Sequence, residues 1–421
     1  MMSNSANGIS EEEVDTEPSF GGTQEFGAEP KSRPLHICFL NMQIEYYSPV
    51  SGGAIATVIM NFARSLLARG CRVSVLTIVN KDPVYPAGNV VPLRHGCREN
   101  LSFIQRRISG MRGRLNGWDY PYYEYYRDSF MKELKKLSPA PDAVIVYNDF
   151  ISLKYVKKAL PGTKVVLALQ NEQRTKYPDI EGALSQADLF APVCNYIRDW
   201  TTKTYNIPRE RQVPVSPGVD LDAFKPRENY LAPRKPVRVL FIGRIDPNKG
   251  PDIVADAVAL LRREGVPLTL TVTGSLWFYG HGNEMANPYF RELKGKMDAA
   301  EAHYTGHVTR PDVPALVRDH DIVCVLSRSN EPYGLVTLEG MASGCAVVAS
   351  NRGGLPESCG KAAIMVNPDD FEAVVSALRS LATRPEMLLH YKQLGIEHAA
   401  TQSWMAKSAV IEELLTQKPG S

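Results

Sequence analysis

The predicted folded part of this chain begins with a short apolar strand. A glycine-containing loop, an amphipathic helix and a second strand follow it. Residues 35–40 are rich in strand formers, the loop 48–53 contains two glycines, and the apolar residues of 54–68 recur at three- and four-residue intervals before Gly70. Residues 72–79 return to a strand pattern. Because this order begins a parallel sheet with helices between its strands, the sequence predicts an α/β domain.

The same alternation then begins a second time. Residues 227–236 contain two prolines and few large apolar side chains, as a linker does, and a new strand follows at 237–243. Further strands are expected at 143–147, 165–169, 189–193, 268–273, 322–326, 346–349 and 363–366, and further helices at 150–160, 195–205, 251–263, 288–300, 311–318, 336–342 and 370–381. Two Rossmann-like, doubly wound domains are therefore predicted, over residues 34–226 and 237–400, with a ligand cleft between them.

Composition narrows the classes of protein that remain. The 48 Lys and Arg residues nearly balance the 46 Asp and Glu residues, which argues against a nucleic-acid partner. Seven scattered cysteines without a C-x-x-C pair favour a reducing cytosol and no zinc site. Residues 1–33 are polar and acidic and are expected to be a disordered tail. Since no apolar run approaches the ~20 residues of a membrane span, we expect a soluble, cytoplasmic protein.

The densest polar cluster runs from Ser327 to Gly344, where a predicted strand passes through a loop into a helix. The first N–H groups of such a helix form an anion site. Glu331 precedes the helix and Glu339 lies eight positions later. A carboxylate accepts two hydrogen bonds from a vicinal diol, so this pair suits a phosphate between two polyhydroxylated rings, as in a nucleotide-sugar. From the spacing alone, a loop carboxylate and an exposed helix charge are the simpler interpretation.

Two further loops carry matching chemistry. Gly243 and Arg244 end the first strand of the second domain, and Lys249 opens the next helix, so both cations could neutralise a diphosphate in the cleft. Ordinary surface cations are the alternative. Gly52 and Gly53 permit close approach of a phosphate to the backbone, but they equally serve a tight turn.

At these places the sequence resembles the retaining family-4 glycosyltransferases of GT-B fold. Glu331 and Glu339 match the E-x7-E motif of that family, and the strings Gly243–Gly250, Ser216–Pro226 and Gly344–Glu357 are also similar to it. The resemblance covers nearly the whole chain from about Leu35. It implies a GT-B fold in which residues 401–421 form a helix that crosses back to the first domain.

The resemblance also implies roles for individual residues. Glu331 would hold hydroxyls of the donor sugar, while Arg244 and Lys249 would stabilise the leaving diphosphate; these three are the predicted catalytic residues. The predicted donor-binding residues are Gly52, Gly53, Gly243, His307, Gly334, Leu335, Val336, Thr337 and Glu339. Among them His307 would lie near the base, although a lone histidine is more often structural.

One loop departs from the family pattern. Many members carry a histidine after the strand that corresponds to 165–169, whereas this chain has Gln170, Asn171 and Glu172. The amides can bind a sugar hydroxyl but cannot titrate near neutral pH, which puts a histidine-dependent proton step in doubt. These three residues are the predicted acceptor-binding set, with Glu172 either a substitute for the histidine or an ordinary loop carboxylate.

The resemblance thus implies a retaining, metal-independent transfer of a hexose-type sugar from a nucleoside diphosphate to an acceptor hydroxyl. UDP is the favoured carrier because it is common in that family, although no residue excludes GDP or ADP, and no cofactor is expected beyond the nucleotide-sugar substrate. Another GT-B enzyme, such as a nucleotide-sugar epimerase or a glucan synthase, and a non-catalytic nucleotide-sugar binder remain alternatives. The acceptor, whether sugar, lipid or small molecule, and the oligomeric state stay open.

A basic and aromatic segment, residues 98–127, fits none of these roles. It contains four closely spaced arginines followed by several tyrosines. Such a segment could make a weak peripheral membrane contact or hold an acceptor. A solvated face over an aromatic edge of the first core is the slightly favoured alternative.

Overall fold

The computed structural model describes residues 33–94, 102–117, 122–232, 234–276 and 283–416. Residues from Leu35 onward group into one compact unit. The predicted tail, residues 1–33, lies almost entirely outside the described residues.

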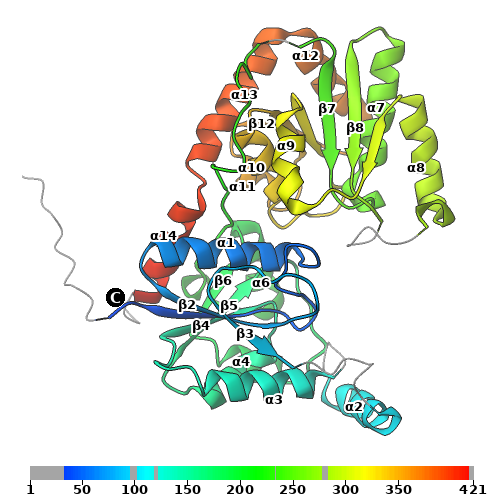
Figure 1. Cartoon of the computed structure of the whole chain (residues 1–421). Coiled ribbons are helices and arrows are strands. Elements are labelled where there is room, and N and C mark those ends of the chain that lie inside the picture. Colours follow the sequence, from blue (N-terminus) through cyan, green and yellow to red (C-terminus); the bar gives the residue numbers. More distant parts are fainter. Residues whose placement is uncertain (1–32, 95–101, 118–121, 233, 277–282, 417–421) are drawn as a thin grey trace, which may run out of the picture. The chain divides into compact units, whose positions relative to one another are not determined.

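The first half of the chain forms a parallel six-stranded sheet in the order β3-β2-β1-β4-β5-β6 (Figure 1). β1 lies at its centre, with Phe39 opposite Val75 of β2 and Ile145 of β4. Its strands are β1 (His36–Leu40), β2 (Arg72–Ile78), β3 (Asn89–Leu93), β4 (Ala143–Tyr147), β5 (Lys164–Leu169) and β6 (Leu189–Pro192). The helices are α1 (Ala54–Ala68), α2 (Phe103–Asn116), α3 (Tyr123–Leu134), α4 (Ser152–Ala159), α5 (Ile180–Leu184) and α6 (Asn195–Tyr205).

The second half repeats this plan in a sheet of order β12-β11-β10-β7-β8-β9. Its strands are β7 (Val237–Ile242), β8 (Leu268–Thr273), β9 (His303–Gly306), β10 (Ile322–Val325), β11 (Ala346–Ser350) and β12 (Ala363–Val366). The helices are α7 (Pro251–Arg263), α8 (Pro288–Ala299), α9 (Val313–Arg318), α10 (Leu335–Ala342), α11 (Leu355–Cys359), α12 (Phe371–Thr383) and α13 (Pro385–Ala400), followed by α14 (Trp404–Thr416). The predicted two-domain α/β fold class is confirmed.

Both faces of each sheet are covered by helices, and β1, which is apolar after His36, shows the consequence for the sequence. All five of its residues are buried. Ile37 and Phe39 join the core beneath α1, whereas Cys38 and Leu40 join the core that contains Tyr126 of α3. Successive side chains point to opposite faces, so a strand buried on both sides is apolar or, as at His36, has hydrogen-bond partners for its polar atoms.

The interval between residues 81 and 118, which gave no prediction, contains β3 and α2, and α13 was also not anticipated. The apolar residues of α2 are largely exposed, unlike those of the helices that cover the sheets. α13 follows α12 after a single intervening residue, and its first residue is Pro385, which suits the first turn of a helix.

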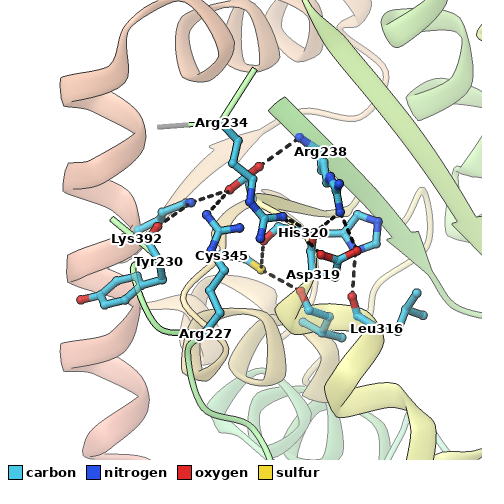
Figure 2. A network of polar contacts seen from close by, with 11 residues as sticks. Arg227, Tyr230, Arg234, Arg238, Leu316, Asp319, His320, Cys345 and Lys392 are labelled. Carbon is cyan, nitrogen blue, oxygen red and sulfur yellow. Dashed lines mark hydrogen bonds and ion pairs between the residues drawn. The ribbon is translucent and has the colours of Figure 1, made fainter. Parts of the chain in front are cut away.

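A buried polar network fastens the segment before β7 to the second sheet (Figure 2). Lys392 of α13 and Asp321 are 2% and 1% exposed, and Lys392 Nζ donates to Asp321 Oδ1 at 2.7 Å. The same ammonium donates to the carbonyl of Tyr230 at 3.1 Å, and the Arg227 guanidinium reaches Asp321 Oδ1 at 3.3 Å. Buried charges are tolerated only when paired, so this network ties the linker firmly to β10 and α13.

The chain passes between its two halves twice, once before β7 and once between α13 and α14. These two connecting segments contact each other. The N–H of Val219 donates to the carbonyl of Gln402 at 2.8 Å. A Cβ on Gly218 would lie 2.5 Å from the backbone nitrogen of Trp404, so only glycine permits this approach. Beyond the crossing, the rings of Trp404 and Phe62 pack edge to face at 5.0 Å, which places α14 against α1.

Candidate active site

A cavity of about 640 Å³ lies where loops at the carboxyl ends of both sheets meet. Its size is that of a small-molecule ligand pocket, and its position follows the rule for doubly wound sheets. Most of the predicted site residues line it: Gly52, Gly53, Gln170, Asn171, Gly243, Arg244, Lys249, His307, Glu331, Gly334, Leu335, Val336 and Glu339. Thr337 and Glu172 do not.

The N-terminus of α10 opens on this cavity. Gly334 precedes the helix with a φ of +83°, and no side chain of that residue caps the helix. A Cβ there would also lie 2.5 Å from Leu355 Cδ2. Leu335 and Val336 line the cavity, so the unpaired N–H groups of the first turn form an anion site at its wall.

Thr337 was predicted to bind the donor, but its polar groups are engaged inside the fold. Its N–H donates to the carbonyl of Gly334 at 3.0 Å, and its hydroxyl donates to the same oxygen at 2.7 Å. The hydroxyl also lies 3.1 Å from that of Ser358. Thr337 therefore links the first turn of α10 to α11 and is not part of the cavity wall.

Glu331 and Lys249 form an ion pair at the edge of the cavity. The Ser327 hydroxyl donates to Glu331 Oε2 at 3.1 Å, and the N–H of Gly354 donates to the carbonyl of Glu331 at 2.7 Å. Lys249 is carried by a tight turn whose last residue, Gly250, has a φ of +70°. A cation and an anion from loops of different strands are thus held together where a charged ligand could separate them.

Glu339 forms a second ion pair, with Arg310. The carboxylate is 3% exposed, and Arg310 also lines the cavity, with its guanidinium 5.3 Å from the centre of the Phe224 ring. Burial lowers the pKa of Arg310, but the Glu339 carboxylate outweighs that effect and raises it overall. Arg310 therefore stays charged. The sequence analysis did not identify it, because it lies on the loop after β9 and no motif joins it to Glu339.

The other predicted cation, Arg244, is held at 2.9 Å from Asp246. Asp246 also accepts from the N–H of Asn248 at 2.8 Å and so shapes the turn that carries Lys249. The two predicted cations consequently stand on one turn after β7, and both line the cavity.

On the opposite wall, Glu45 occupies the N-terminus of α1. Its Oε2 accepts from the N–H of Ala56 at 2.9 Å, and a Cβ on Gly53 would overlap the same carboxylate. Burial raises the pKa of Glu45, while hydrogen bonds from the amides of Ala56 and Ile55 oppose that rise. Gly53 therefore makes room for an acidic side chain of its own chain, a partner that the sequence analysis did not identify.

Two of the three predicted acceptor-binding residues line the cavity, and the third does not. Gln170 and Asn171 line the cavity, and the N–H of Gln170 donates to Asn148 Oδ1 at 2.8 Å. Glu172 points elsewhere, because its carboxylate accepts from the hydroxyl of Tyr196 and lies 3.4 Å from Asn330 Nδ2. Of the two interpretations of Glu172, the geometry therefore favours a loop carboxylate that links neighbouring segments.

Among the described residues, no group of three or more His, Cys, Asp or Glu side chains is arranged to hold a metal ion. No described helix is long and apolar enough to cross a membrane. The metal-independent reaction stays a prediction.

Comparison with solved structures defines the class. The HepE protein of Anabaena, solved with UDP and glucose, superposes with a TM-score of 0.66 over 91% of this chain and 99% of its own, at 17% identity. At that identity the likeness shows the fold alone. It is the GT-B fold, two doubly wound domains with a cleft between them.

Sequence matches show which proteins the chain resembles. Residues 236–384 match the family model of the glycosyl transferases group 1. A D-inositol 3-phosphate glycosyltransferase of Saccharomonospora viridis is 32% identical over 250 residues, 55% of this chain and 56% of that protein. Spore coat protein SA of Bacillus subtilis is 28% identical over 313 residues, 68% of this chain and 81% of that protein.

The second half of the chain is thus similar to the glycosyl transferases group 1, in agreement with the predicted resemblance. The predicted GT-B fold is confirmed, and the retaining stereochemistry stays a prediction. Over several curated relatives the chain spans little more than half of their length, from 52% to 60%.

Proposed function

We propose that this protein transfers a hexose-type sugar from a nucleoside diphosphate, with UDP as the favoured carrier, to an acceptor hydroxyl with retention and without a metal. One observation carries the proposal. The helix N-terminus at Gly334 faces a cavity in which two carboxylates, Glu331 and Glu339, are each paired with a cation. That arrangement suits a ligand with a diphosphate and two hydroxylated rings.

Donor binding would exchange the partners of these charges. The diphosphate accepts from the amides at the start of α10 and attracts Lys249 and Arg244, which frees Glu331 to accept from hydroxyls of the donor sugar. Glu339 accepts from the ribose hydroxyls beside Arg310. In the empty cavity these charged side chains neutralise one another. When the donor binds, the ion pair separates and the same side chains bind the donor.

The transfer step breaks the bond between the anomeric carbon and the phosphate oxygen. The acceptor oxygen bonds to the same face of that carbon, and its proton passes to a phosphate oxygen of the leaving nucleoside diphosphate. Lys249 and Arg244 stabilise the negative charge that develops there, which is the contribution that a divalent metal would otherwise make. EDTA should accordingly leave the rate unchanged.

Paired substitutions test the two carboxylates separately. We expect Glu331→Ala to lower the transfer rate by about a hundredfold or more with a small change in UDP affinity. Glu339→Ala should chiefly weaken UDP binding, by about tenfold. Calorimetry gives the affinity and release of UDP gives the rate. Glu386→Ala, at an exposed position of α13, is the matched control. Wild-type behaviour of both variants would contradict the site.

A non-catalytic nucleotide-sugar binder is the second candidate. It is favoured by the absence of a titratable histidine at Gln170 and Asn171, and by the engagement of Glu172 with Tyr196. Such a binder would hold UDP yet leave a labelled donor intact with every acceptor of a broad panel. The labelled products also separate transfer from epimerisation of the donor and from growth of a glucan.

A further inference from the structure

The apolar side chains of α2 point into solvent. Phe103, Ile104, Ile108, Met111 and Leu115 are 69%, 68%, 41%, 60% and 77% exposed. Figure 1 draws α2 in cyan. Only Ser109 in this helix is buried. A helix that packs on a core normally buries its apolar side chains. α2 instead turns its apolar face toward solvent.

The exposed side chains form one continuous stripe. The intervals between its members are four, three and four residues, for Ile104, Ile108, Met111 and Leu115. This spacing places the four side chains within an arc of about 60° on the helix surface. The buried Ser109 lies on the other side of the helix. The stripe is therefore a feature of the whole helix and not a single exposed side chain.

Positive charge borders this stripe. Arg107 and Arg114 lie along one edge and Arg112 along the other, all three are exposed, and the helix contains no acidic residue. Apolar side chains between cationic edges are typical of a helix that lies in the interface of a bilayer, where arginines meet lipid phosphates. At 14 residues α2 is too short to span one.

The helix is built to persist although its outer face lacks packing. Ser102 and Gln105 form a reciprocal capping box at its start, and Gly117 ends it with a φ of +62°. Gly110 and Gly113 oppose this, because each costs about 1 kcal/mol relative to alanine in a helix interior. A Cβ at either glycine would meet no atom within 4 Å, so neither is required by packing.

We propose that α2 docks this protein on a membrane surface that contains anionic phospholipid. Ile104, Ile108, Met111 and Leu115 enter the boundary between headgroups and acyl chains, and the arginines bind headgroup phosphates. A second copy of the chain fits this face poorly, because a twofold contact would bring the same arginines against each other.

Vesicle co-sedimentation of the full chain tests the proposal. Wild type should bind vesicles of phosphatidylcholine with phosphatidylglycerol, and bind phosphatidylcholine alone much more weakly. The triple variant Ile104→Glu/Met111→Glu/Leu115→Glu should abolish binding. Arg107→Glu/Arg112→Glu/Arg114→Glu should lower affinity for the anionic vesicles by at least about tenfold, and added salt should reproduce that loss.

Matched controls separate docking from net charge and from unfolding. Lys158→Glu/Arg263→Glu/Lys361→Glu makes the same change in charge at exposed positions of other segments, and Met285→Glu places a carboxylate at another exposed methionine, 51% exposed. Both should bind vesicles nearly as well as wild type. All variants should keep the melting temperature of wild type, because the substituted side chains are exposed.

Three outcomes would overturn the proposal. The wild-type chain could ignore anionic vesicles, or the α2 variants could bind them as well as wild type does. Alternatively, size-exclusion chromatography could show a dimer that the glutamate triple variant dissociates, which would make the stripe an interface between copies of the chain.

Discussion

α1 and α10 begin in the same way on opposite walls of the cavity, and they differ in what meets their first amides. Each follows a glycine that offers no side-chain cap, Gly53 for α1 and Gly334 for α10. At α1 the Glu45 carboxylate accepts from the N–H of Ala56. At α10 the cap is absent and Leu335 and Val336 form the cavity wall. The chain supplies its own anion to one helix and leaves the other for a ligand, so we assign the diphosphate to α10.

The largest effect should come from Lys249, which pairs with Glu331 in the loop before α10. Lys249→Ala removes a charge that we assign to the leaving diphosphate, and we expect the transfer rate to fall by about a hundredfold or more. Its melting temperature should change little, because the ion pair with Glu331 is partly exposed. Steady-state kinetics with Lys361→Ala as an exposed control measures the effect. A rate within threefold of wild type, about 0.7 kcal/mol or less in barrier, would remove Lys249 from the site.

Alanine at the two helix-starting glycines should separate the two N-termini. Gly334→Ala places a side chain at a φ of +83° and 2.5 Å from Leu355, so we expect a loss of about 1–3 kcal/mol in stability and a weaker affinity for UDP. Gly53 has a φ of −87°, and the atoms in its way belong to the flexible end of Glu45. Gly53→Ala should therefore cost less than about 1 kcal/mol.

Denaturant unfolding and calorimetry with UDP measure both variants. If Gly53→Ala weakened UDP binding more than Gly334→Ala, the diphosphate would have to be placed at α1 instead.

The smallest effect should follow from Glu45→Gln. Since burial raises the pKa of Glu45 above its ordinary value of 4.5, proton release is harder in the folded state than in the unfolded chain. The contribution of this group to stability is thus complete below pH 4.5 and is lost as the pH rises through the raised pKa. Glutamine does not titrate, so the melting temperature of the variant relative to wild type should rise by at most about 2 °C over that interval.

The same variant also tests the anion site at α1. Without the carboxylate, pyrophosphate should bind a few-fold more tightly, because the positive end of the helix dipole is no longer neutralised. Calorimetry at neutral pH detects this change, and an unchanged affinity would contradict the view that Glu45 occupies the site.

Local sequence was enough to predict the charged residues around the start of α10. It was not enough to predict the carboxylate at the start of α1. Glu331, Gly334 and Glu339 lie on one strand–loop–helix segment, so their proximity follows from chain order. Arg310 reaches Glu339 across 29 positions and Glu45 reaches Ala56 across 11, and neither pairing leaves a local pattern. Both depend on how separate loops fold back over the ends of the strands.

The α2 segment shows a different limit. A helical pattern can place Ile104, Ile108, Met111 and Leu115 on one stripe, but it cannot say whether that stripe faces a core or solvent. Tyr123 and Tyr126 of the neighbouring α3 were expected at an aromatic edge of the core, and they are 1% and 0% exposed. Only the packing of the first sheet distinguishes these two outcomes.

The hydrogen bond between Val219 and Gln402 has a mechanical consequence. Since the two covalent connections between the halves run side by side at this point, neither can bend independently of the other. Arg227 and Tyr230, a few residues further along, are clamped through Asp321 and Lys392 to the second sheet. Opening of the cleft would therefore have to swing about a short double pivot near Gly218, upstream of the clamp.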